Sequence, residues 1–251
     1  MAITAKEVNE LRKMTGAGMM DCKKALTEAD GDYDKAIDIL RTKGQKVSAS
    51  RADRDAKEGV VFIKTNADST ESVLVALACE TDFVAKNEEF QVAGNKIAEI
   101  AYEQNPASIE ALTALPFDTL TVGEKLTQLI GKIGEKIEIK FYERLTGEVV
   151  IPYIHSGSKL GVLVALANAN GSDVVEAGKD VAMQIAAMRP IAVSKDSVDQ
   201  ATVDHELAIG REIAIAEGKP EQIVDKIANG KLNKFFQENT LLSQKFVKDS
   251  G

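Results

Sequence analysis

The feature that most constrains this chain is an internal repeat. With a shift of 89 residues and no gap, residues 60–62 align with residues 149–151, and residues 73–78 align with residues 162–167. All four segments are short, and they consist of Val, Leu, Ala, Phe and Ile. In each copy, the two segments are typical of the strands of a β-hairpin. The sequence therefore predicts a duplicated core.

A helix comes after each hairpin, but at a different offset. Residues 93–98 align with residues 177–182 at a shift of 84, so the first copy has five more residues between its last strand and its helix. The extra length lies within residues 79–90 and carries Phe83 between acidic residues. The second copy closes with the shorter segment 168–174, so this longer turn is not needed to close the fold.

Residues 1–44 predict three short helices that pack as a bundle of the ubiquitin-associated type. A threonine followed three residues later by a glutamate opens the first helix as a capping box, and glycines are placed to end the others. The residues expected to begin or end these helices are Thr4 with Glu7, Asp21, Gly31, Asp32 and Gly44. Between the first two helices lies a tight Gly-rich turn, residues 14–20.

Residues 195–235 predict a helical hairpin of coiled-coil character that is inserted into the fold. The expected apolar stripe consists of Val203, Leu207, Ala214, Ile223, Ile227 and Phe235. Gly218 and Pro220 supply the punctuation between the two helices. The hairpin also offers a surface through which two copies could pair as a homodimer.

These segments together predict an α+β fold with antiparallel sheets. The expected division of the chain is a three-helix domain with a basic linker (1–55), core repeat 1 (56–145), core repeat 2 (146–194), the helical hairpin (195–235) and the start of a C-terminal module (236–251). Its 251 residues, 44% of them hydrophobic, are enough to bury a core without staples.

The composition argues against several classes of function. The two cysteines, Cys22 and Cys79, are far apart and outside any CxxC, so neither a disulfide framework nor a zinc site is indicated. No segment is apolar enough to span a bilayer, which favours a soluble, cytoplasmic protein. The net charge of −8 disfavours nucleic acid as a partner. Residues 41–57 are locally basic but lack aromatic side chains for base stacking, so a solvated linker or helix face is favoured over an RNA contact.

No active site is apparent in the sequence. It contains no GxxxxGK[ST] loop to cradle phosphates. The histidines, His155 and His205, have no neighbouring cysteines or dense carboxylates that would form a metal site or a nucleophile triad. His155 lies at the expected tip of the second hairpin, where it would be exposed. We therefore expect a protein that is not an enzyme and that carries no metal or cofactor.

Two long motifs resemble those of a known family. The sequence resembles the elongation factor Ts family in Leu11-Arg12 with Thr15-Gly16-Ala17-Gly18-Met19-Met20-Asp21-Cys22-Lys23-Lys24-Ala25-Leu26, and in Thr81-Asp82-Phe83-Val84-Ala85-Lys86. Lys132-Ile133-Gly134-Glu135, His155 with Gly161-Val162-Leu163-Val164, and Gly218-Lys219-Pro220 add to the similarity. The resemblance covers essentially the whole chain.

The resemblance implies a guanine nucleotide exchange factor that acts in translation elongation. Its partner would be the GTPase elongation factor Tu, from which it would promote GDP release by disturbing the nucleotide and magnesium site. The residues that the family implies for partner binding and exchange are Thr81, Asp82, Phe83, Val84, Arg12, Met19, Met20, Ile133 and His155. Asn9 departs from the lysine that relatives often carry. Relatives usually continue past a segment like 246–249, so a helix and a strand are expected to be missing after Gly251.

The sequence allows two interpretations of Phe83 and two of the methionines Met19 and Met20. Phe83 either protrudes or packs back beneath its turn, and the longer turn together with the motif favours exposure. Met19 and Met20 either face a partner or fill gaps in the small helical domain, as methionine commonly does. An alternative function is a ubiquitin-associated-type adaptor without exchange activity, in which the N-terminal bundle binds peptide or ubiquitin-like ligands. An RNA-binding role for residues 41–57 is a third.

Overall fold

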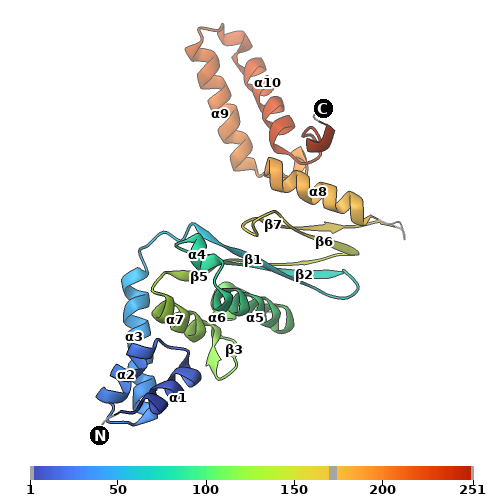
Figure 1. The fold of residues 1–251 in the computed structure, drawn as a ribbon. Helices are drawn as coiled ribbons and strands as arrows, with labels where there is room; N and C mark the ends of the chain where they lie inside the picture. Colours follow the sequence, from blue (N-terminus) through green and yellow to red (C-terminus); the bar gives the residue numbers. More distant parts are fainter. Residues whose placement is uncertain (1–2, 170–173, 250–251) are drawn as a thin grey trace. The chain divides into compact units, whose positions relative to one another are not determined.

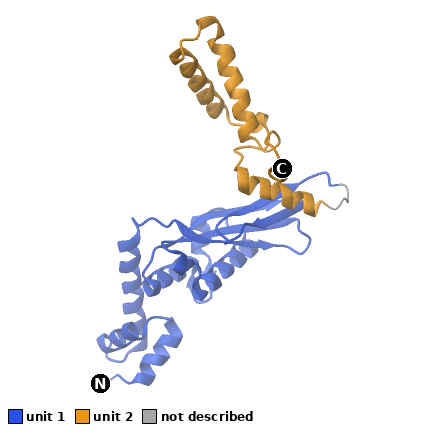
Figure 2. Cartoon of the chain, turned by 45° about the horizontal axis from the view of Figure 1, so that its top comes forward, with its two compact units in different colours: residues 1–170 blue, residues 171–251 orange. Residues whose placement is uncertain are grey.

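The computed structural model describes residues 3–169 and 174–249. The chain divides into two compact units, residues 1–170 and residues 171–251 (Figure 2). Residues 170–173 belong to the short connection of the second copy, and most of that connection therefore lies outside the described residues. Among the described helices, none combines the length and the apolar character that crossing a membrane requires.

The elements of the first unit are the helices α1 (Ala5–Thr15), α2 (Met19–Glu28), α3 (Tyr33–Arg51), α4 (Asp82–Ala85), α5 (Glu88–Gln104), α6 (Ile109–Ala114) and α7 (Val122–Ile133), and the strands β1 (Glu58–Thr65), β2 (Glu71–Cys79), β3 (Pro116–Phe117), β4 (Leu120–Thr121), β5 (Ile137–Thr146), β6 (Val149–Ile154) and β7 (Gly161–Leu166). The second unit holds α8 (Val175–Met188), α9 (Gln200–Ala216), α10 (Glu221–Asn239) and the 3₁₀ helices Lys195–Ser197 and Val247–Asp249. Helices with small antiparallel sheets confirm the α+β class.

The two predicted hairpins share one register. In the first hairpin, Val60 lies opposite Leu77, and in the second, Val149 lies opposite Leu166. All six residue pairs of β6 and β7 equal pairs of β1 and β2 shifted by 89 residues. Because a slip of one residue would turn every side chain to the opposite face, an identical register lets equivalent positions face the same way, as at Phe62 and Ile151, which are both buried.

The first hairpin lies at the centre of a layered core. Strand β5 pairs with β2 to give the sheet order β1-β2-β5, and helices α5 to α7 lie on one side of it while β6 and β7 lie on the other (Figure 1). On the helical side, Phe62 packs over Gly94, where an added Cβ would lie 2.1 Å from its ring. On the other side, the amide of Val61 donates to the carbonyl of Ser158 at 2.7 Å.

The three N-terminal helices surround a small apolar cluster of their own. The capping box of Thr4 and Glu7 forms as expected, and Asp32 accepts from the amide of Lys35 at the start of α3. The cluster contains Val8, Leu11, Cys22, Ala25, Leu26, Ala29 and Ala36. Helix α2 begins at Met19 and not after Asp21, so Asp21 lies in its first turn, where a carboxylate interacts favourably with the helix dipole.

The expected stop at Gly44 is wrong, because α3 continues through it to Arg51. The glycine instead permits a close helix crossing with α7. A Cβ added to Gly131 would lie 2.7 Å from the Cα of Gly44. A glycine at a helix crossing and a glycine at a helix end look alike in a sequence. Only the tertiary contacts distinguish the two.

The basic segment 41–57 is therefore largely helical and partly neutralised. Lys43 forms an ion pair with Asp21, and Arg51 lies 3.5 Å from the carboxylate of Glu80. Lys57 lies 3.0 Å from Asp55. These pairings favour the interpretation of this segment as a helix face followed by a short connection.

Helices α9 and α10 form the predicted helical hairpin, but the buried stripe of α10 differs from the expected one. Ile223 is exposed, whereas the buried side chains of α10 are Val224, Ala228 and Leu232. The helices come closest where a Cβ added to Gly210 would lie 3.0 Å from the Cα of Ala228. Because the helices approach through small residues, the buried face of α10 lies about one residue further along the chain than expected. The expected stripe was formed by the large residues Ile223, Ile227 and Phe235.

Candidate functional site

The five additional residues of the first copy accompany a single helical turn, α4, between β2 and α5. Within this turn, Val84 and Ala85 are buried in the core. Phe83 points away, and 81% of its surface is exposed. Successive helical residues are about 100° apart, so burying two neighbours of Phe83 directs its ring to solvent. The expectation that Phe83 is exposed is confirmed, whereas Val84 lies in the core and its side chain is not available for a partner.

Helix α4 is anchored by a residue distant in the sequence. Thr81 begins the helix, and its hydroxyl donates to Oε1 of Glu135 at 2.8 Å while its amide donates to Oε2 at 3.0 Å. Glu135 comes directly after Gly134, which ends α7 with a φ of 83°. No role for Glu135 was predictable from the sequence, because a contact over 54 positions leaves no local pattern.

A second clamp holds the residue before this turn. The backbone amide of Lys136 donates to Oε1 of Glu80 at 2.7 Å, and Arg51 at the end of α3 lies 3.5 Å from Oε2. Two successive carboxylate contacts, at Glu80 and Thr81, therefore fix the start of α4. A short helix held at its first residues and at its buried side presents its remaining side chains in a defined direction.

Asp82 is charged and partly exposed on the same turn. Lys86 donates to its carboxylate at 2.7 Å, and this hydrogen bond is the largest cause that lowers the pKa of Asp82, with a further contribution from the charge of Lys159. A lowered pKa means that Asp82 carries its negative charge at neutral pH. The turn therefore offers a carboxylate and an aromatic ring side by side in sequence.

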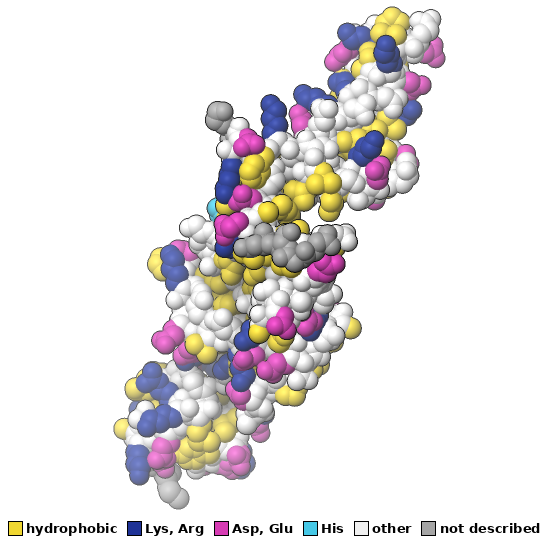
Figure 3. All heavy atoms as spheres, turned by 90° about the vertical axis from the view of Figure 1, so that its right-hand side faces the viewer, with side chains coloured by type: hydrophobic (Ala, Val, Ile, Leu, Met, Phe, Trp, Pro, Cys, Tyr) yellow, Lys and Arg dark blue, Asp and Glu magenta, His cyan; other side chains and the backbone are white. Residues whose placement is uncertain are grey.

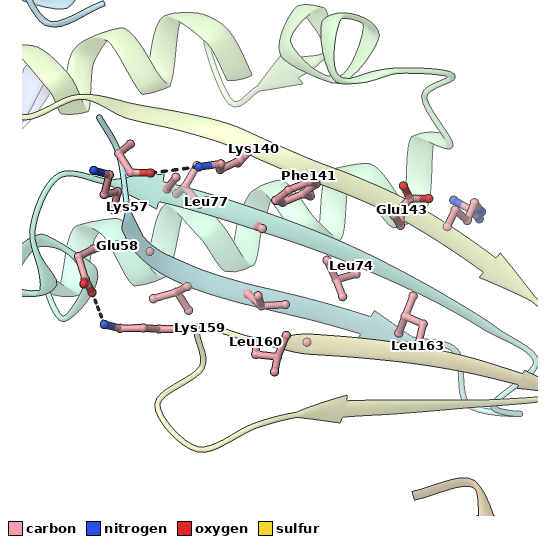
Figure 4. A pocket seen from close by; sticks show the side chains of 18 of the residues that line it. Lys57, Glu58, Leu74, Leu77, Lys140, Phe141, Glu143, Lys159, Leu160 and Leu163 are labelled. Atoms are coloured by element: carbon pink, nitrogen blue, oxygen red, sulfur yellow. Dashed lines mark hydrogen bonds and ion pairs between the residues drawn. The ribbon is translucent and has the colours of Figure 1, made fainter. Parts of the chain in front are cut away.

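The tip of the second hairpin lies at the same end of the sheet as α4. β1 starts and β2 ends there, because Glu58 pairs with Cys79. Lys159 at the tip forms an ion pair with Glu58 (Figure 4). His155 begins the tip, is exposed, and has its Nδ1 2.9 Å from the hydroxyl of Tyr153. The structure thus brings the His155 tip towards the Asp82 turn.

The remaining predicted site residues lie elsewhere in the first unit. Ile133 is the last residue of α7 and is half-buried against the core. Arg12 is exposed in the last turn of α1, and Met19 and Met20 are 57% and 63% exposed in the first turn of α2. Hydrophobic side chains are visible on the surface near this N-terminal end (Figure 3). Burial of the two methionines, one of the open interpretations, is therefore wrong.

A groove of about 590 Å³ lies on the face of the sheet away from α5 (Figure 4). Leu74 and Phe141 from the sheet and Leu160 and Leu163 from the second hairpin line it. None of the predicted site residues does. Across residues 3–169 and 174–249, no group of three or more His, Cys, Asp or Glu side chains is placed to hold a metal ion.

The turn thus presents an exposed aromatic ring beside a charged carboxylate, and both are held on a clamped helix. The family model "Elongation factor TS" matches residues 80–251. Elongation factor Ts of Amoebophilus asiaticus is 59% identical over 250 residues, covering 100% of this chain and 90% of the relative. Those of Cytophaga hutchinsonii and Christiangramia forsetii are 58% and 51% identical, covering 99% of this chain and 90% and 89% of the relatives.

The chain belongs to the elongation factor Ts family. Members of this family are guanine nucleotide exchange factors for elongation factor Tu in translation elongation, and this is the role of the chain. The alternative of a ubiquitin-associated-type adaptor is not supported, because the matches extend over the whole chain and not over its N-terminal helices alone.

Proposed function

We propose that the chain promotes GDP release by inserting the Asp82-Phe83 turn beside the nucleotide and magnesium site of elongation factor Tu. The observation that carries this proposal is the 81% exposure of Phe83 on a helix whose base is fixed by Glu135. An exposed aromatic side chain offers a large apolar area that a partner can bury. The clamp at Thr81 presents it in one orientation.

The chemistry of this step is displacement. Magnesium requires a near-ideal octahedron of oxygen ligands that bridges the GTPase and the phosphates, and a small disturbance of it weakens nucleotide binding. The ring of Phe83 would wedge between elements of the partner, while the ionised Asp82 would attract groups near the ion. No bond is made or broken, so the chain needs no cofactor and performs no reaction of its own.

The other predicted residues would supply affinity and position. Arg12, Met19 and Met20 would contact the nucleotide-binding domain of the partner, and Ile133 and His155 would contact another of its domains. Thr81 and the buried Val84 would act by holding α4 in place. Binding of nucleotide and binding of this chain weaken each other by the same factor, so several separate contacts are needed to oppose a tightly bound GDP.

We also propose the finer architecture that the resemblance implies. The N-terminal helices would form a ubiquitin-associated-like domain over residues 1–55, followed by core repeats at 56–145 and 146–194. Residues 195–235 would act as a coiled coil, and 236–251 would begin a C-terminal module. A role in translation would be carried out in the cytoplasm, and a homodimer through α9 and α10 stays a prediction.

The test is the substitution Phe83→Ala, with Phe141→Ala as a matched control. Phe141 is also an exposed phenylalanine, at 57%, but it lies on the sheet and away from the clamped turn. Stopped-flow release of a fluorescent GDP analogue from elongation factor Tu should slow at least tenfold for Phe83→Ala at matched saturation. Thermal unfolding should be nearly unchanged, because no buried surface is lost.

The control should release nucleotide at a rate close to that of the unmodified chain. If Phe83→Ala unfolds normally and still releases GDP at the original rate, Phe83 has no part in the mechanism. A loss of stability of about 3 to 5 kcal/mol would instead show that its ring is buried in solution.

A further inference from the structure

Three exposed methionines surround the Gly-rich turn between α1 and α2. Met14 is 63% exposed at the end of α1, and Met19 and Met20 are 57% and 63% exposed at the start of α2. Large apolar side chains at this degree of exposure leave their sulfur atoms accessible to dissolved oxidants. Thioethers accept an oxygen atom to become sulfoxides, which are polar and chiral.

The two thiols of the chain are protected where the methionines are not. Cys22 and Cys79 are fully buried. Burial raises the pKa of Cys22 and raises that of Cys79 to about 11, with the charges of Glu135 and Glu58 adding to the latter effect. The reactive form of cysteine is the thiolate, so both side chains stay protonated and slow to react. Cys22 lies only two residues from Met20, and the structure buries one sulfur while it exposes the other.

We propose that Met19 and Met20 form an oxidation-sensitive site through which peroxides weaken binding to the partner. The thioether sulfur attacks one peroxide oxygen, the O–O bond breaks, and an S–O bond forms. Each methionine loses two electrons, and the hydrogen peroxide is reduced to water. The proposal rests on the docking role proposed for these two residues.

The consequence for binding comes from desolvation. A thioether on a docking surface loses little when water is removed, whereas a sulfoxide oxygen must give up its hydrogen bonds to water unless the partner replaces them. Sulfoxides are returned to thioethers by the methionine sulfoxide reductases MsrA and MsrB, one enzyme for each epimer. The loss of binding would therefore be reversible, as a regulatory site requires.

The experiment treats the folded chain with hydrogen peroxide and maps sulfoxides by mass spectrometry of its peptides. The concentration of the treated chain that gives the half-maximal rate of GDP release from elongation factor Tu is then measured. We expect Met19 and Met20 to be oxidised before the half-buried Met183 and before either cysteine. The half-maximal concentration should rise at least tenfold with little change in the maximal rate, and both reductases together should restore it.

Each variant is compared with its own untreated form. In Met19→Leu with Met20→Leu, peroxide should leave the half-maximal concentration within about twofold, because leucine takes up no oxygen. In Met14→Leu and in Met188→Leu, peroxide should raise the half-maximal concentration as much as it does in the unmodified chain. An equal loss in the double leucine variant, or unchanged binding with both sulfoxides fully formed, overturns the proposal. Untreated Met19→Ala with Met20→Ala tests the docking role separately, since an unchanged half-maximal concentration there removes the docking role itself.

Discussion

The two copies of the repeat share a hairpin register and differ in the segments that come after the hairpin. The first copy adds β5 to its sheet and places α4 between β2 and α5. The second copy has a two-stranded hairpin, and in the sequence alignment it has five fewer residues between the hairpin and the following helix. Residues common to both copies serve the fold. The difference lies in Asp82–Ala85 and its clamp, where the first copy exposes a phenylalanine that packing does not require.

The largest effect is expected at a buried position that both copies share. Phe62 and Ile151 are equivalent in the repeat, and each is only 4% exposed. Phe62→Ala should destabilise the chain by about 3 to 5 kcal/mol, because it leaves a cavity against Phe90 and α5, whereas Ile151→Ala should cost about 2 to 5 kcal/mol. Denaturant unfolding of both variants gives the values. A negligible loss at either site would show that the copies do not use this position alike.

A smaller effect is expected at the glycine that both copies place on the following helix. Gly94→Ala pushes a methyl group into the ring of Phe62, and overpacking of this kind costs about 1 to 3 kcal/mol. The same substitution should cost less in a chain that also carries Phe62→Ala, because the cavity accepts the methyl group. A double-mutant cycle measures this coupling. Purely additive losses would mean that the close approach is relieved in solution.

The clamp on α4 should matter more for function than for stability. Glu135→Gln keeps the size of the side chain but removes the negative charge of the carboxylate, whose oxygens accept two hydrogen bonds from Thr81. We expect a loss of stability of about 1 kcal/mol. The rate of GDP release from the partner should fall by more than this loss of stability explains. The reason is that the orientation of Phe83 is no longer fixed. The control is Glu138→Gln, which lies on β5 and pairs with Lys136. Equal exchange rates for the two variants would contradict a positioning role for Glu135.

The smallest effect is expected at Lys86. Lys86→Met removes the hydrogen bond that lowers the pKa of Asp82, so this pKa should rise towards its ordinary value. A carboxylate with a lowered pKa stabilises the fold above its unfolded pKa and loses that contribution as the pH falls through the folded one. Because the pair is exposed, the melting temperature near neutral pH should barely change. An NMR titration of Asp82 that shows no rise would exclude Lys86 as the cause.

The parts of the fold that were predictable from the sequence depend on neighbours in the chain. The capping box at Thr4, the left-handed glycines at Gly31 and Gly218 and the two hairpins are encoded within a few residues each. The exposure of Phe83 was also predictable, because the repeat supplies an internal comparison.

The parts that were not predictable depend on residues that meet only after folding. Gly44 continues a helix because Gly131 lies against it. Val84 is buried and Phe83 is exposed, although both belong to one motif. The contact of Thr81 with Glu135 joins two segments whose resemblance to the family was visible, but whose contact was not. A motif identifies which residues matter, whereas the tertiary structure decides which of them face a partner.

With the two contacts proposed above, the continuous helix α3 would give the first unit the properties of a bivalent ligand with a stiff spacer. Its 19 residues span about 28 Å, and the part from Lys43, which pairs with Asp21 beside Met20, to Arg51, which lies against Glu80, would separate the two proposed contacts. When one contact forms, a stiff spacer of matching length holds the second at high effective concentration, whereas a flexible chain would spread it over many positions. Each residue inserted into α3 would rotate one contact by about 100° around the helix axis relative to the other. Avidity for the GTPase would thus depend on helical phase as well as on length.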